Sequence, residues 1–406
     1  MDIPFVPHAF DNTRPRDSVS LLLTSLFPAC EPTTVEYRVT QLSQGTTNAL
    51  FKVTLGDPCE GSEERAINND TALIKVYGDG TEITIDREKE IRFHAILSAH
   101  DLAPRLLCRF LNGHAYQFLA GNVCSADDIR EKRIWRGVAR ELGRLHAVLP
   151  TNTDHDQGAQ TNSPSGPNIW STARKWLDAI PSATGPELDQ KNILLNDFEF
   201  LKSKLLWNKG LDHSQVLGHG DLLCGNIILQ DSILDAPAGD IARVKFIDYE
   251  HSTYCPRAFD LANHFSEWAG FECDYNLLPT KSTRRDFIRE YLQSYREITG
   301  QRNKVAEPLQ SHDVDSRETE LNQLLAEVDM YRGFPGFYWG LCALIQAAAA
   351  KGSIEFDYAG YAAKRFSEYR AWREEEDGTR LAAGRDMSLR EMKWEQNIEK
   401  LPYLKF

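Results

Sequence analysis

The sequence lacks several features that define whole classes of protein. Its eight cysteines are scattered over 406 residues without a C-x2-C pair, which argues against a zinc module and against a disulfide scaffold. The stretch Met1-Asp2-Ile3-Pro4 has no basic region leading into an apolar core, so we expect no signal peptide. The longest apolar run, from Leu341 to Ala350, contains a glutamine and is too short to span a bilayer. These absences predict a cytoplasmic protein with reduced thiols and no integral membrane segment.

Basic residues are in the minority. The chain has 46 Lys and Arg against 59 Asp and Glu, which gives a formal net charge of −13. Such an acidic surface repels a phosphate backbone, so we expect no nucleic-acid partner, whereas a small cation suits it. The length allows two domains or one large fold with two lobes.

The most informative stretch runs from His219 to Trp268. In it, Asn226 follows Asp221 after four intervening residues, and a later β-like run ends in Asp248. Phosphoryl transfer needs this set, because one carboxylate accepts the proton of the attacking hydroxyl while an amide oxygen and a second carboxylate hold Mg²⁺. The pattern predicts Asp221 as the base and Asn226 and Asp248 as metal ligands. A capped loop beside a core strand is the alternative, and the aspartate that ends the β-like run favours catalysis.

Three segments carry a family resemblance: HGDLLCGNII at 219–228, FIDYE at 246–250 and FDLANHFSEWAG at 259–270. Together they resemble the choline/ethanolamine kinase family. The Leu-Leu-Cys after the first aspartate and the Ala-Gly after the glutamate–tryptophan pair are closer to the ethanolamine branch. The resemblance extends from about residue 37 to about residue 370.

This resemblance implies an α+β, two-lobed, protein-kinase-like fold, as in aminoglycoside phosphotransferases. A small antiparallel β lobe (1–121) would bind the nucleotide, and a large, mainly helical lobe (122–406) would carry the catalytic and substrate sites. The implied reaction transfers the γ-phosphoryl group of ATP, with Mg²⁺, to ethanolamine, the first step of phosphatidylethanolamine synthesis. Family members are often dimers, so a homodimer is an option, although no pattern here identifies an interface.

Three alternatives stay open at this point. A choline kinase or a dual choline/ethanolamine kinase is the nearest one. A phosphotransferase acting on another amino-alcohol or on an aminoglycoside also uses a His-Gly-Asp motif. A catalytically dead relative serving as a scaffold is the third, but such chains often lose an Asp or the Asn of the site, and both are present here.

The first lobe should begin with two paired strands at 37–42 and 49–55, which alternate between apolar and polar residues. The segment between them contains Gly45 and short hydroxyl residues and could lay backbone N–H groups over phosphates, because the glycine permits close approach. A plain surface hairpin is the alternative, but the segment matches the phosphate-covering loop of the family. The implied nucleotide-binding residues there are Gly45, Thr46, Thr47 and Asn48.

A single lysine, Lys75, lies within the apolar strand predicted at 71–78. A buried ammonium group is costly without partners. In the kinase arrangement these are nucleotide phosphates and a glutamate of the following helix, which we expect at 83–99 with Glu90 in that position. A solvated helix face is the alternative for this glutamate, because charged residues precede it.

A hairpin over 105–119 should follow, with Asn112-Gly113 forming a type I′ turn. The family resemblance places the hinge at 117–121, at the end of this hairpin. There, Gln117 and Leu119 would offer groups to the adenine of ATP.

The second lobe should contain helices at 134–149, 169–180 and 188–207. His146 lies on the first of these, where it is expected to be a core histidine. Further helices should follow at about 260–270, 337–346 and 358–374. The tail beyond carries no catalytic signature, and its aromatic residues, Trp394 among them, would dock onto the body or onto a second subunit. Polar insertions are expected at 57–70, 150–168 and 301–319.

No Ala-Pro-Glu segment follows Asp248, which favours a small hydroxyl acceptor over a peptide. A structural role in a helix cap or an ion pair is the alternative to substrate binding for Asp260. Core packing is the alternative for the later aromatic residues. Relatives commonly have tryptophan where this chain has Cys342, and losing one aromatic wall should weaken choline more than ethanolamine. The resemblance implies that the ammonium end of the substrate contacts Glu250, Asp260, Glu267, Trp268, Trp339 and Tyr361.

Overall fold

The computed structural model describes residues 3–26, 36–42, 48–55, 71–149, 168–230, 240–302, 313–349 and 356–397. The predicted insertion 57–70, residues 150–167, residues 303–312 and the loop residues Gly45, Thr46 and Thr47 lie outside these ranges. The described residues of the insertion predicted at 301–319 are helical, because they belong to the helices Lys281–Arg302 and Asp313–Tyr331, so this part of the prediction is wrong. The chain divides into two compact units, a smaller one of residues up to Asn122 and a larger one of residues 123–349 and 357–406. Among the described helices, none has the length and apolar character needed to cross a membrane.

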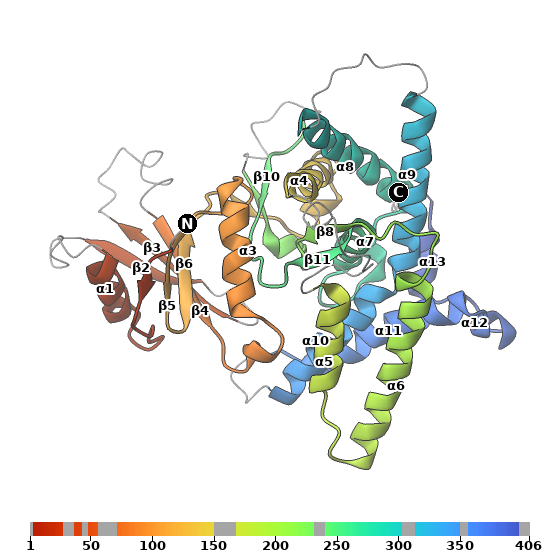
Figure 1. Cartoon of the computed structure of the whole chain (residues 1–406), viewed down its shortest axis with the longest axis horizontal. Coiled ribbons are helices and arrows are strands. Elements are labelled where there is room, and N and C mark those ends of the chain that lie inside the picture. Colours follow the sequence, from red (N-terminus) through yellow and green to blue (C-terminus); the bar gives the residue numbers. More distant parts are fainter. Residues whose placement is uncertain are drawn as a thin grey trace, which may run out of the picture. The chain divides into compact units, whose positions relative to one another are not determined.

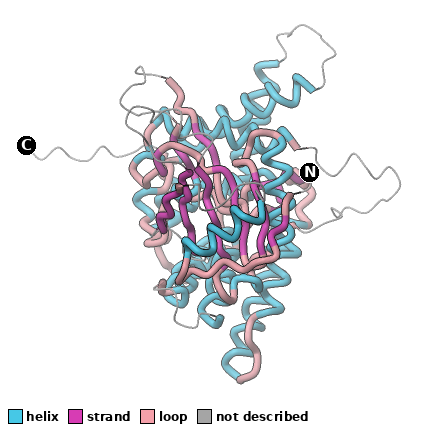
Figure 2. The backbone as a smooth tube through the Cα atoms, turned by 90° about the vertical axis from the view of Figure 1, so that its left-hand side faces the viewer, coloured by secondary structure: helices cyan, strands magenta, loops and turns pink. Residues whose placement is uncertain are grey.

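The smaller unit is built on one six-stranded sheet with the order β1-β5-β6-β4-β3-β2 (Figure 1). Figure 2 shows these strands running side by side in a single layer. All neighbouring pairs are antiparallel except β1 with β5. The strands are β1 (Phe5–Val6), β2 (Tyr37–Leu42), β3 (Asn48–Leu55), β4 (Thr71–Tyr77), β5 (Leu106–Phe110) and β6 (Gly113–Gln117).

Two helices cover opposite faces of this sheet, as the alternation along β4 shows. Ile74 and Val76 belong to the apolar core that also contains Val19 and Leu22 of α1 (Pro15–Leu26). Lys75 points to the other face, because side chains alternate along a strand. There it meets α3 (Arg87–Ala99). The apolar face makes the core of the unit, and the other face carries buried charge.

The second helix begins later than the sequence predicts. We expected a start near residue 83, but Thr81–Ile83 form a short 3₁₀ turn and α3 begins at Arg87. The side chain of Asp86 accepts a hydrogen bond from the N–H of Lys89 and caps the helix, so the start moves to this residue.

The predicted type I′ turn is wrong. Gly113 already belongs to β6 and pairs with Phe110, so the connection consists of Leu111 and Asn112. Neither of these residues has the positive φ that a type I′ turn requires. The side chain of Asn112 instead accepts a hydrogen bond from the N–H of Phe10 at 2.8 Å and donates one to its carbonyl at 3.0 Å. This tertiary contact selects the turn.

The larger unit is mainly helical, and among its described residues two groups of short strands position its loops. β9 (Ile227–Leu229) lies between β10 (Val244–Phe246) and β7 (Asn122–Val123), and β8 (Gln215–Gly218) pairs with β11 (Thr253–Pro256). The main helices are α4 (Lys132–Val148), α5 (Ile169–Ala179), α6 (Gly185–Leu201), α7 (Arg257–Glu267), α8 (Lys281–Arg302), α9 (Asp313–Tyr331), α10 (Phe334–Ala349) and α11 (Tyr358–Glu376). A small sheet-based unit and a large helical unit confirm the predicted α+β class.

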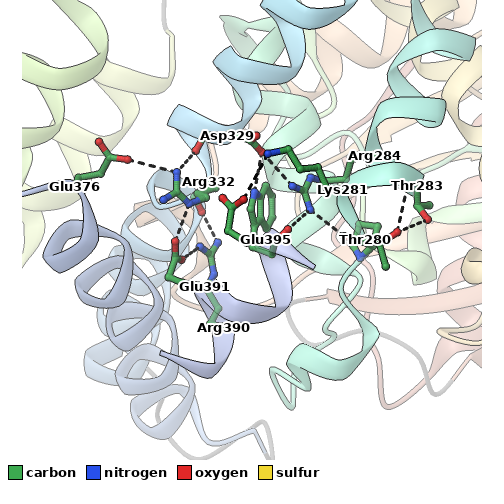
Figure 3. Close-up of polar contacts among 12 residues, drawn as sticks. Thr280, Lys281, Thr283, Arg284, Asp329, Arg332, Glu376, Arg390, Glu391 and Glu395 are labelled. Carbon is green, nitrogen blue, oxygen red and sulfur yellow. Dashed lines mark hydrogen bonds and ion pairs between the residues drawn. The ribbon is translucent and has the colours of Figure 1, made fainter. Parts of the chain in front are cut away.

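The C-terminal segment docks onto the body of the larger unit through α13 (Leu389–Glu395), which follows α12 (Thr379–Ala382) (Figure 3). Trp394 is fully buried and donates a hydrogen bond from Nε1 to Oδ1 of Asp329 at 2.8 Å. Arg284 of α8 donates to the carbonyl of Trp394 at 2.8 Å, and Arg332 forms an ion pair with Glu391 at 2.7 Å. The sequence predicted that the tail would dock either onto the body of the protein or onto a second subunit. For Trp394, the structure shows docking onto the body.

Candidate active site

The loop His219-Gly220-Asp221 follows directly after β8. Gly220 has a φ of 79°, and a Cβ atom built on it would lie 2.4 Å from the carbonyl oxygen of His251. Only glycine fits this close approach at a left-handed backbone angle. The middle residue of the motif is therefore required by the path of the loop, which delivers Asp221 to the site.

Asp260 of α7 binds this loop through its carboxylate. Its carboxylate accepts hydrogen bonds from the N–H groups of His219 and Gly220, both at 2.9 Å, and contacts Nε2 of His146 at 3.0 Å. Burial raises the pKa of Asp260, but the hydrogen bonds from His146 and Gly220 outweigh it and the pKa lies below its usual value. The geometry favours a role in positioning the loop over the predicted substrate contact, because both carboxylate oxygens already bind the loop or His146. It is a positioning residue for the loop.

His219 is neutral in this setting. It is fully buried, and burial lowers its pKa to about 4. Nε2 lies 3.0 Å from the carbonyl oxygen of Ile247, so Nε2 carries the proton and Nδ1 accepts from the N–H of Asp221 at 3.4 Å. The histidine of the motif thus ties the loop to the end of β10 and does not act as an acid.

Asn226 and Asp248 are brought together by the register of two strands. Phe246 is paired with Ile227, and the N–H of Ile247 donates to the carbonyl of Asn226 at 3.0 Å. Asp248 then leaves the strand with a φ of 64°, a strained angle for a residue other than glycine that often marks functional sites. The predicted ligand pair therefore lies at one end of the β9–β10 ladder.

The amide group of Asn226 has a defined orientation. Nδ2 donates to the backbone carbonyl of Asp221 at 2.8 Å and lies 3.4 Å from its Oδ2. The nitrogen therefore faces the catalytic loop, which leaves Oδ1 as the atom that can bind a cation. An amide oxygen beside a carboxylate is a donor set that suits Mg²⁺.

Carboxylates are concentrated around Asp221. Burial raises its pKa well above the usual value, and the negative charges of Glu267, Asp248 and Glu250 raise it further, while a hydrogen bond from Asn226 lowers it. Such an arrangement is costly in the absence of a cation, because like charges repel at short range. The site is built to receive positive charge.

Two aromatic side chains predicted to contact the substrate are tied to α7 by their indole N–H groups. Nε1 of Trp339 donates to Oδ1 of Asn263 at 2.8 Å, and Nδ2 of Asn263 donates to the carbonyl of Gly220 at 2.9 Å. Nε1 of Trp268 donates to Nε2 of His264 at 3.2 Å. Both indole N–H groups are engaged and both side chains are almost fully buried. Only ring atoms of Trp339 and Trp268 could therefore face a substrate.

Sequence analysis missed Asn263 and His264 as parts of the site. His264 Nδ1 lies 2.8 Å from the carbonyl oxygen of Leu222, so both residues hold the catalytic loop. A signal was present, because Asp260, Asn263, His264 and Glu267 recur at helical spacing and mark one polar face of α7. All four side chains are buried, which identifies this face as the one turned to the loop.

The remaining candidates for the substrate site lie on α11 and beside it. Glu250 and Tyr361 are buried. Burial raises the pKa of Tyr358, and the charges of Cys342 and Glu250 raise it further. Glu267 contacts Arg365 at 3.0 Å, a partner that the sequence did not suggest.

Within the smaller unit, Lys75 and Glu90 form a buried ion pair with 2.9 Å between Nζ and Oε1. Arg87 also contacts Glu90, at 2.9 Å, and reaches Oδ1 of Asn48 at 3.0 Å. The expected pairing of the strand lysine with the helix glutamate is present. Arg87 is a further member of this cluster, although its sequence neighbours suggested only a solvated face.

The predicted hinge residues follow β6. Gln117 is the last residue of this strand and donates its N–H to the carbonyl of Arg105 at 2.9 Å. Within the described ranges, neither backbone group of Leu119 has a hydrogen-bond partner. A free backbone donor and acceptor at this position suits the recognition of an adenine edge.

Comparison with known proteins shows a match to the family described as Choline/ethanolamine kinase over residues 39–370. Mouse ethanolamine kinase 1 is 34% identical over 366 residues, which covers 88% of this chain and 90% of that protein. The solved ethanolamine kinase of Plasmodium vivax has a TM-score of 0.66 at 23% identity and covers 88% of this chain and 89% of its own. Choline kinase of Cryptosporidium parvum has a TM-score of 0.61 at 18% identity, covering 91% and 97%.

Proposed function

The chain belongs to the choline/ethanolamine kinase family, and we propose that it transfers the γ-phosphoryl group of ATP to the hydroxyl group of ethanolamine, giving phosphoethanolamine and ADP. The observation that carries this proposal is the set Asp221, Asn226 and Asp248, which one loop and one strand ladder bring together. Relatives that are at least 32% identical over most of this chain bear the name ethanolamine kinase.

Asp221 acts as the base in this proposal. Its carboxylate orients the hydroxyl group of ethanolamine and receives its proton as the oxygen attacks phosphorus. A raised pKa makes it a better proton acceptor than an ordinary aspartate, provided that it is ionised when the substrate binds. The ammonium group of the substrate and the metal ion both add positive charge to the site, and positive charge favours the ionised form.

Asn226 Oδ1 and the carboxylate of Asp248 would hold Mg²⁺. The donor set fits this ion, which prefers oxygen ligands and binds through one or two carboxylates together with phosphate oxygens. When bound, the ion would neutralise charge on the transferring phosphoryl group. Asp248 has a strained backbone angle just after the strand, and the bond from Nδ2 to the loop keeps the amide oxygen of Asn226 available.

The smaller unit supplies the contacts to ATP in this proposal. Lys75, held by Glu90, would steady the phosphates, and the hinge residues Gln117 and Leu119 would receive the adenine. Asn48 and the preceding loop residues Gly45, Thr46 and Thr47 would cover the phosphates, a role that rests on the family resemblance alone. Nucleotide use itself follows from membership of the kinase family.

Ethanolamine is the preferred acceptor in this proposal because the pocket offers carboxylate acceptors and lacks one aromatic wall. A primary ammonium group has three N–H donors and needs acceptors such as Glu267 and Glu250, whereas a quaternary ammonium group depends on ring faces. Trp339 and Tyr361 can supply two ring faces. The position that relatives fill with a further tryptophan holds Cys342 in this chain.

The decisive experiment measures ADP release with Mg²⁺ and ATP while ethanolamine, its mono- and dimethyl derivatives and choline are offered in parallel. We expect kcat/KM to fall with each added methyl group. A flat or rising series would make choline the substrate, which is the second candidate because two aromatic residues of the pocket remain. Turnover of none of the four would remove this proposal and direct attention to other amino-alcohols.

A cytoplasmic location and a homodimer complete the proposal. The dimer is proposed because members of the family are often dimers, and sedimentation velocity of the purified full chain tests it. Fractionation of the cells that express the chain tests the location.

A further inference from the structure

The strongest feature that the proposed reaction does not use is a buried trio of charges beside the acceptor site. Glu267 lies on α7, and Arg365 and Glu368 lie one turn apart on α11. Nη2 of Arg365 is 3.0 Å from Oε1 of Glu267, and Nε is 3.3 Å from Oε2 of Glu368. All three side chains are at most 4% exposed.

Close packing of α10 against α11 fixes the place of the guanidinium group. A Cβ atom built on Gly336 would lie 2.7 Å from the carbonyl oxygen of Arg365, and one built on Gly340 would lie 2.8 Å from the ring of Phe366. The two glycines therefore let the helices approach where Arg365 emerges. Its Cζ atom lies 5.8 Å from the centre of the Tyr361 ring, so the arginine also borders a predicted wall of the ammonium pocket.

The contacts within the trio are ion pairs that lack hydrogen-bond alignment. In the described part of the chain, Nε, Nη1 and Nη2 of Arg365 have no aligned acceptor, and Oε1 of Glu267 has no aligned donor. A buried carboxylate oxygen without an aligned donor is costly. It is also an acceptor that a bound N–H group could satisfy, and Glu267 is the carboxylate whose charge contributes most to the raised pKa of Asp221.

The net charge of the trio is complementary to the charge of one substrate molecule. Two carboxylates and one guanidinium carry a formal net charge of −1 when all are ionised, and ethanolamine carries one positive charge. Burial raises the pKa of Glu267, and the charge of Arg365 opposes this rise. Without the arginine, two buried carboxylates would face each other across the gap, and protonation would remove the charge that attracts the ammonium group.

We propose that Arg365, with Glu368 behind it, is a positioning residue for the acceptor site: its ion pair holds the Glu267 carboxylate in its ionised form and leaves Oε1 able to accept a hydrogen bond from the ammonium group of the substrate. Arg365 does not touch the substrate itself. This inference rests on the proposed function, because it concerns how that site recognises its acceptor. It assigns recognition of the ammonium group to a three-residue network and not to Glu267 alone.

The test compares Arg365→Gln, Arg365→Lys and Glu368→Gln with the wild-type enzyme, using initial rates at saturating ATP. We expect Arg365→Gln to raise KM for ethanolamine roughly tenfold or more, the size of one charge-assisted hydrogen bond, with kcat within about threefold of wild type. Arg365→Lys keeps the charge and loses the planar fork, so its KM should lie between the two. Glu368→Gln cancels the net charge of the trio and should also raise KM.

Lys364→Gln is the matched control, because Lys364 precedes the arginine on α11 and forms an exposed ion pair with Glu272. It should leave KM unchanged. Where Arg365→Gln does not fold, as thermal unfolding would show, the lysine variant and Glu368→Gln decide. An unchanged KM for ethanolamine in these folded variants, or an equal change in KM for ATP, would overturn the inference. A wild-type enzyme that does not phosphorylate ethanolamine would instead overturn the proposed function.

Discussion

Replacing Asp221 with asparagine separates the contribution of this residue to catalysis from its effect on the stability of the folded protein. The side chain keeps its size, and the 2.8 Å bond from Asn226 goes to the backbone carbonyl of residue 221, so it survives the change. The proton acceptor is lost, and we expect kcat to fall by about 10²–10⁴, the usual contribution of a positioned general base. Binding of ATP should remain.

The same substitution should stabilise the folded protein. The pKa of Asp221 is raised in the folded state, so its ionised form is disfavoured there relative to the unfolded chain, and the cost is present at pH values above the unfolded pKa. A neutral amide removes the repulsion by Glu267, Asp248 and Glu250. A gain on the order of 1 kcal/mol is expected, about 1–2 °C in Tm for a chain of 406 residues, when unfolding is followed in EDTA at pH 8.

Asp260→Asn is the matched variant with the opposite expected result. The pKa of this carboxyl is lowered, and its oxygens accept from His219, Gly220 and His146, so the amide should destabilise the protein by about 2–4 kcal/mol. A lower Tm for Asp221→Asn, or an equal change in both variants, would refute the argument from repulsion. Near-normal turnover in Asp221→Asn would remove it from its role as base.

Three further results are expected. Mg²⁺ should raise the Tm of the nucleotide-free enzyme because it neutralises crowded carboxylates, and Asp248→Asn should abolish this shift in scanning fluorimetry. Burial lowers the pKa of both His94 and His219 to about 4, below the value of about 6.5 in the unfolded chain, so the free energy of unfolding should fall as the pH drops from 6.5 towards 4 in urea titrations. Cys342→Trp restores an aromatic wall and should raise the ratio of choline to ethanolamine kcat/KM about tenfold, as rates with both substrates would show.

Each of these three predictions has an outcome that would contradict it or a control variant of the same chain. An unchanged Mg²⁺ shift in Asp248→Asn would place the ion elsewhere. His94→Gln keeps a donor for the carbonyl of Pro104, which Nε2 of His94 contacts at 2.7 Å, and should reduce the loss of stability in acid; an identical pH profile would contradict the assignment. Cys342→Ser should leave the substrate ratio unchanged, and an unaltered ratio in folded Cys342→Trp would reject the role of the missing wall.

The candidate catalytic set could be proposed from the sequence because its members follow from local spacing. Asp221 and Asn226 lie on one short loop, and a strand ending in Asp248 pairs beside it, so chemistry and spacing point to the same three residues. The pairing of Lys75 with Glu90 is local in the same sense, because a strand and the next helix carry them. Periodicity also predicted many of the helices and strands, but α1, α8 and α9 were not predicted, and other elements differ at their ends. The turn at Leu111-Asn112, for example, depends on a distant backbone.

Only the tertiary structure distinguished the two acids of α7. Asp260 and Glu267 lie on one helix face and look alike in sequence, yet one accepts from the catalytic loop while the other meets Arg365. That arginine comes from a helix much later in the chain, brought near by the close approach of α10 and α11. Which carboxylate is free to receive an ammonium group depends on the partners that surround it. These partners come from segments far apart in the chain, so no local pattern can reveal them.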